Sequence, residues 1–189
     1  MFDEVIKKEE IYYAVSMLPG ILIAIYWYLT SEIKDNKYKL LFFSYIITCI
    51  CSFIYHLKKS IYDDDLDTKW YRLDIIGQQF TLYVSILLSR HGFRGIIALS
   101  PLFVATYLAN FSDKSECLIG TIAHALSILI GSFAQNIYAV IRWLFSFIIY
   151  SLKDFYPNKY SHILWHILCH RNITKNWQYL YDDILLKLY

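Results

Sequence analysis

The chain has 189 residues and a formal net charge of +2, and 57% of its residues are hydrophobic against 18% that are charged. Soluble domains average about 45–50% apolar residues. Here the charges form short clusters between long apolar runs, which is typical of a polytopic membrane protein. The sequence shows neither a basic block nor a glycine-rich phosphate loop, so it indicates no nucleic-acid partner. It predicts one all-α transmembrane domain over residues 1–189.

Seven apolar runs come close to the roughly 20 residues that a helix needs to cross a bilayer. A short segment, residues 1–10, precedes the first run, which has no small-residue cleavage site and is predicted to be a retained span. Polar links separate the runs, so the predicted fold is a seven-transmembrane helix bundle. The runs cover about 11–30, 39–57, 70–89, 93–110, 116–134, 136–153 and a seventh stretch that begins near 158.

Two parts of this division are weakly marked. No charge separates the fifth and sixth runs, where the predicted turn covers Ser132 to Asn136. A single helix over 116–153 would reach about 57 Å at 1.5 Å per residue. That is nearly twice a hydrocarbon core of about 30 Å, so a hairpin is favoured. The amphipathic tail, about 171–189, either lies along the membrane interface or continues the seventh helix.

The orientation in the membrane stays open. Lys and Arg residues divide equally between the two sides, so the positive-inside rule gives a tie. The expected localisation is that of an integral, multi-pass protein of the endoplasmic reticulum, the Golgi or the plasma membrane.

Ionisable residues inside membrane spans are costly and mark functional sites. Ser52 and His56 lie one turn apart near the end of the second run, and Asp74 lies just inside the third. His162 and His166 open the seventh run, again one turn apart. With seven spans, all of these residues lie near the same membrane surface. The sequence therefore predicts one shared intramembrane site.

The three histidines suit a zinc ion with a fourth position open for water, which the metal would activate as a nucleophile. Asp74 could take the proton from that water, and Ser52 could hydrogen-bond an oxyanion. A lone histidine in a helix bundle is more often a hydrogen-bonded packing residue than a ligand. It is the convergence of these residues that favours a metal site.

Other polar residues are predicted to have simpler roles. His170, beside Arg171 where the apolar run ends, is predicted to be interfacial. His124 is predicted to pack in the bundle. The alternative is that it hydrogen-bonds to one of the metal ligands and orients it. The acidic link from Asp63 to Asp67 is expected to be solvated rather than to bind calcium. The cysteines are predicted to be small buried hydrophobes: Cys49, Cys51, Cys117 and Cys169.

The pattern resembles the CREST superfamily of seven-span membrane proteins, which includes alkaline ceramidases, adiponectin and progestin receptors, hemolysin-III-like proteins and myomaker. The matching stretches are SFIYH (52–56), YRLD (71–74) and SHILWH (161–166). The resemblance implies that His56, His162 and His166 bind zinc. It also implies that Ser52 and Asp74 complete the site.

Two functions follow from this resemblance. The first is a zinc-dependent hydrolase that cleaves a lipid amide or ester, with ceramide as the leading substrate and a phospholipid as the other. The second is a non-enzymatic, myomaker-like protein of membrane remodelling or cell fusion, with a structural zinc site. The interval of 17 residues between His56 and Asp74 is closer to the myomaker side of the family.

Overall fold

The computed structural model describes residues 2–30, 36–61, 67–89, 91–110, 118–133, 136–155 and 159–188. These residues are almost entirely helical and contain no strand, so the predicted all-α fold is confirmed. The helices are α1 (Phe2–Val15), α2 (Leu18–Thr30), α3 (Asn36–Ile61), α4 (Asp67–Leu88), α5 (Gly92–Asn110), α6 (Leu118–Phe133), α7 (Ile137–Phe155) and α8 (Lys159–Leu188).

Helices α1 and α2 form one rod with a break at Ser16 and Met17. Pro19 has no N–H to donate to the carbonyl of Val15, four residues earlier, so a continuous helix is interrupted just before it. Proline is tolerated in the first turn of α2, where the N–H would have no partner within the helix. The rod therefore counts as one segment, and the described helices form seven such segments.

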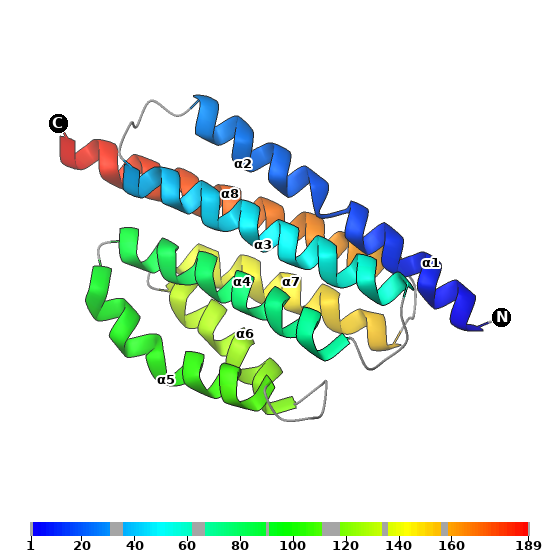
Figure 1. Ribbon diagram of the computed structural model, residues 1–189. Helices are drawn as coiled ribbons and strands as arrows, with labels where there is room; N and C mark the ends of the chain where they lie inside the picture. Colours follow the sequence, from blue (N-terminus) through cyan, green and yellow to red (C-terminus); the bar gives the residue numbers. More distant parts are fainter. Residues whose placement is uncertain are drawn as a thin grey trace.

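The seven segments pack against one another in chain order, and the last segment closes the bundle against the first. Each segment lies against its neighbours in the sequence, and α8 returns to contact α1 and α2. Successive segments run in opposite directions, so the two ends of the chain lie at opposite ends of the bundle (Figure 1). This arrangement places α3 and α8 on either side of α1, and it makes α1 the element that bridges them.

The division of residues 116–153 into a hairpin is confirmed. Helix α6 ends at Phe133 and α7 begins at Ile137. The Asn136 side chain caps α7, because its Oδ1 accepts a hydrogen bond of 2.8 Å from the backbone N–H of Ala139. Residues 134 and 135 of the predicted turn lie outside the described residues.

Close packing between α3 and α4 fixes the register of the two helices. A Cβ at Gly77 would meet the Cα of Thr48 at 3.2 Å, so the glycine allows the backbones to approach. The Thr48 hydroxyl donates to the carbonyl oxygen of Gly77 at 2.6 Å and lies 2.7 Å from the hydroxyl of Thr81. Asp74 lies one turn before Gly77 on α4, so this contact places it beside α3.

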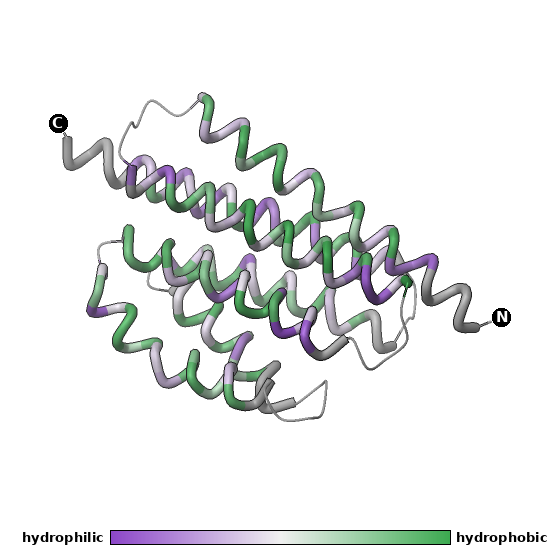
Figure 2. Tube along the Cα trace, in the orientation of Figure 1, coloured by the Kyte–Doolittle hydropathy of each residue, from purple (hydrophilic) through white to green (hydrophobic). Residues whose placement is uncertain are grey.

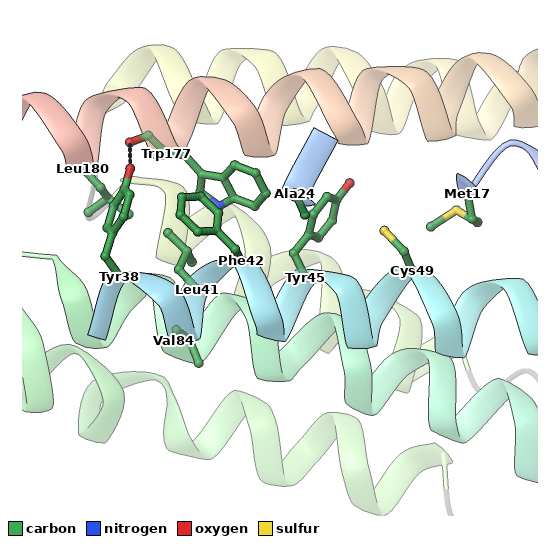
Figure 3. Close-up of a cluster of buried hydrophobic side chains, with 10 residues drawn as sticks. All are labelled: Met17, Ala24, Tyr38, Leu41, Phe42, Tyr45, Cys49, Val84, Trp177 and Leu180. Atoms are coloured by element: carbon green, nitrogen blue, oxygen red, sulfur yellow. Dashed lines mark hydrogen bonds between the residues drawn. The ribbon is translucent and has the colours of Figure 1, made fainter. Parts of the chain in front are cut away.

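An aromatic cluster fills the space between α3 and α8 (Figure 3). The Trp177 ring lies 4.9 Å from Phe42 and 5.3 Å from Tyr45, in edge-to-face contacts. The Tyr38 hydroxyl donates to the carbonyl oxygen of Trp177 at 3.1 Å. Because Trp177 is fully buried, the tail continues α8 inside the bundle instead of lying apart from it.

Two helical stretches among the described residues are long and apolar enough to cross a membrane, Lys8–Thr30 and Tyr38–Ile61. Three further apolar helices are shorter: Gly92–Leu108, Ile122–Ser132 and Ile137–Leu152. Hydrophobic residues recur along most of the length of the helices (Figure 2). Many large apolar side chains on α2, α5 and α7 are exposed, among them Leu22, Phe93 and Tyr138.

An odd number of segments makes a direct prediction about topology. If all seven cross the bilayer, tags at the two ends of the chain should be labelled from opposite sides of sealed vesicles. A tag in the link at 111–117 serves as a control, and it should be labelled together with the N-terminal tag. Labelling of both terminal tags from one side would contradict the seven-span arrangement.

Candidate metal centre

The structure brings together the three histidines that the sequence predicted to share a site. His56 comes from α3, and His162 and His166 come from successive turns of α8. One ligand atom of each lies within 4.8 Å of the others, and His56 and His166 are buried. Neutral imidazoles are good ligands for zinc and for several other divalent transition metals. The group could therefore hold a metal ion.

The His56 ring is held by a carboxylate. Its Nδ1 lies 2.6 Å from Oε2 of Glu10, which is buried on α1. The other carboxylate oxygen of Glu10 forms an ion pair of 3.2 Å with Lys59. When Nδ1–H donates to this carboxylate, the lone pair of Nε2 is free to bind a metal. Carboxylate–histidine pairs of this kind typically orient metal ligands.

The His166 ring is also held through its Nδ1, in this case by a hydroxyl group. The Ser16 Oγ lies 2.5 Å from Nδ1 of His166 and donates its own hydrogen to the carbonyl oxygen of Tyr13 at 2.6 Å. Since the hydroxyl hydrogen is used, the serine accepts from Nδ1–H of His166. This tautomer again leaves Nε2 available for a metal.

The third ring, that of His162, stacks on Tyr13. Their centroids are 4.0 Å apart with an interplanar angle of 17°. Glu10 and Tyr13 on α1 and Ser16 directly after its last residue are spaced by three residues, and each contacts a different histidine of the group. Sequence reasoning missed this helix. The available signal was Glu10, a carboxylate at the edge of the first apolar run.

Asp74 lies beside the histidine group, as predicted. It is buried on α4, and His56, Gln78 and Ser52 are close enough to act on its carboxylate. Its Oδ1 is buried without a hydrogen-bond partner. An unpaired buried acceptor is costly unless something else satisfies it. A metal ion with a water ligand would suit this oxygen, so the residues fit the proposed zinc site. Ser52 is also buried, one turn before His56 on α3.

The prediction for His170 is wrong. Its side chain is only 4% exposed, and its ring lies inside the bundle between α2 and α3. Nδ1 hydrogen-bonds with the Tyr45 hydroxyl, and Nε2 donates to the carbonyl oxygen of Ser16 at 2.9 Å. A Cβ at Gly20 would meet Cε1 of His170 at 2.5 Å, so the glycine makes room for the ring. Because both nitrogens have partners, His170 stands apart from the metal group.

The remaining predictions have mixed outcomes. His124 is buried in the bundle, bonded to glutamines of α4 rather than to the histidine group. Cys49 and Cys51 are buried free thiols, as predicted, and Cys169 is partly buried. Residues 63–65 of the acidic link and Cys117 lie outside the described residues, and only the backbone of Asp67 is described.

Comparison of the chain with family models, curated proteins and solved structures finds no match in any of the three. Membership of the CREST superfamily therefore stays a prediction, carried by the short motifs and by the grouping of their histidines.

The contact between Glu10 and His56 predicts that substitution of Glu10 lowers the affinity for the metal, although all three histidine ligands remain. Glu10→Ala should weaken zinc binding by about 10–100-fold, because removal of a residue that orients a ligand typically has that effect. Glu10→Gln should lose less, since its amide oxygen still accepts from His56. Competition with a chromogenic chelator measures the affinity. Asp182→Ala, an exposed carboxylate on α8, is the control. Equal affinity of Glu10→Ala and the unmodified protein would contradict this role.

Proposed function

We propose that the protein is an integral, multi-pass membrane enzyme that uses zinc to hydrolyse a lipid amide or ester. Ceramide is the leading candidate substrate. The observation that carries the proposal is the group of three histidines with a buried, unpaired carboxylate oxygen beside it. Structural zinc sites are closed by four protein ligands, whereas catalytic sites keep three and an open position. Among the described residues, the histidine group has three members.

A zinc ion at this site would supply Lewis-acid activation of a water molecule and of the substrate carbonyl. Asp74 accepts a proton from the attacking water through its unpaired oxygen and passes it to the leaving amine or alcohol. The Ser52 hydroxyl donates to the carbonyl oxygen as negative charge develops on it. A new C–O bond replaces the amide or ester bond, and the products are a fatty acid and an amine or alcohol.

The protein around the site favours a lipid substrate. The histidines lie between α1, α3 and α8, and both stretches that meet the length of a membrane span, Lys8–Thr30 and Tyr38–Ile61, contribute residues to this region. The many exposed apolar side chains suit contact with acyl chains. The resemblance of the motifs to those of alkaline ceramidases supports the same substrate class.

A non-enzymatic role is the second candidate. The same histidines link α3 to α8, and residues 10–16 of α1 and the break after it contact all three of them, so a metal here would also tie these helices together. This arrangement would suit a structural zinc site in a membrane-remodelling or fusion protein. The unpaired Asp74 oxygen favours the enzyme, because a purely structural site has no use for it.

Fatty-acid release by the purified protein in lipid nanodiscs tests the proposal. Nanodiscs that contain ceramide should yield free fatty acid, and treatment with a chelator should abolish the release. Release from phosphatidylcholine alone would identify an ester substrate. A protein that carries zinc but releases fatty acid from neither lipid would contradict the enzyme and favour the structural role.

A further inference from the structure

A further buried histidine, His124 of α6, packs against α4, the helix that carries Asp74. His124 is only 8% exposed, and both of its ring nitrogens have partners on α4. The Nε2 of Gln79 lies 2.6 Å from Nδ1 of His124, and Oε1 of Gln78 lies 2.9 Å from Nε2. Two consecutive glutamines of α4 therefore hold the imidazole of His124, and no described side chain of α6 belongs to the metal group.

The donor and the acceptor of each hydrogen bond around His124 follow from the chemistry of the two glutamine amides. The Gln79 amide can only donate to Nδ1, so the ring hydrogen of neutral His124 is on Nε2 and is donated to Gln78 Oε1. The oxygen of Gln78 is thereby occupied, and its amide group is left to donate. Gln78 lies one turn after Asp74 on α4, which places the two side chains together. The Gln78 amide is therefore close enough to act on the Asp74 carboxyl as a hydrogen-bond donor.

We propose that His124 is a positioning residue that acts on Asp74 through Gln78. The chain of donors runs from Gln79 to His124, then to Gln78 and to Asp74. It ends at the carboxyl group of Asp74, whose Oδ1 has no hydrogen-bond partner and is available for the reaction. The inference rests on the proposed function, because it gives Asp74 its orientation as the base.

Three variants test this arrangement. His124→Leu removes the donor, whereas His124→Gln keeps an amide N–H that can reach Gln78. His91→Leu makes the same change at an exposed histidine just before α5 and is the matched control. We expect His124→Leu to lower kcat by about 100-fold, the usual cost of a misplaced catalytic group. KM and zinc content should be unchanged, and His124→Gln should recover most of the rate.

The Asp74→Asn background separates positioning from a general structural effect. If His124 acts through Asp74, His124→Leu should cause no further loss of activity once Asp74 has been replaced. An equal loss in both backgrounds would overturn the proposal. So would a His124→Gln variant as impaired as His124→Leu.

The carboxyl ¹³C resonance of Asp74 gives a readout that does not depend on activity. It should shift in His124→Leu, return in His124→Gln and stay in place in His91→Leu. An unchanged resonance in folded His124→Leu would overturn the proposal. If the unmodified protein released no fatty acid, the proposed function would fail, and this resonance would still decide whether His124 controls Asp74.

Discussion

Replacement of His162 or His166 by alanine should remove the metal from the protein. The purified chain should carry about one zinc ion, because three neutral imidazoles and a water complete a tetrahedral site. Loss of one imidazole leaves two ligands, and the affinity should then fall below what survives purification. Metal analysis of protein purified in detergent, relative to protein concentration, measures the effect.

His170→Ala is the matched control for this experiment. It removes the same side chain from the same helix, one turn after His166, but His170 uses both nitrogens on Tyr45 and Ser16. We expect the variant to keep its zinc while its thermal stability falls, since buried partners lose their hydrogen bonds. Stoichiometric zinc in both His162→Ala and His166→Ala would show that the metal, if any, binds elsewhere.

Asp74→Asn should abolish most of the hydrolytic activity while the zinc is retained. Asparagine has nearly the same shape but cannot accept a proton at neutral pH, and general acid–base catalysis typically contributes about 10²–10⁴-fold. The rate of fatty-acid release should fall by a factor in that range. The metal content should stay the same, because the candidate ligands are the three histidines and do not include Asp74.

The comparison that makes this result specific is Asp182→Asn, which changes an exposed carboxylate at the other end of the bundle and should have no effect. Ser52→Ala should lower the rate by a smaller factor, since one hydroxyl donor is lost while the base remains. An Asp74→Asn variant that hydrolyses lipid at the unmodified rate would remove Asp74 from the mechanism.

Much of the architecture could be predicted from the sequence. The hairpin between α6 and α7 was inferred from helix length and from the polar turn residues up to Asn136, and the Asn136 cap supplies its local cause. The alternation of segments then placed His56 near His162 and His166, and the structure brings these three together. The inference succeeded because the direction of each helix in a bundle follows from the number of turns before it.

The errors have a common physical cause. A hydropathy pattern treats a polar residue near the end of an apolar run as an exit from the membrane. In α8 the polar residues His170, Asn172 and Asn176 instead lie inside the bundle, where they bond to other helices. The role of Glu10 was missed for the same reason, because its partner on α3 is distant in sequence. Partners of buried polar groups are set by tertiary packing, which periodicity does not reveal.

The support that Glu10 and Ser16, near the N-terminus, give to the histidines has a consequence for biosynthesis. Ser16 and His166 are separated by 150 positions in the chain, whereas Glu10 and His56 are separated by 46. During translation the Glu10–His56 pair can therefore form early, but the metal group stays incomplete until α8 has been made. Contacts of such long range form late, because the loop that they close is large. Metal acquisition thus reports that α8 has docked against α1 and α3.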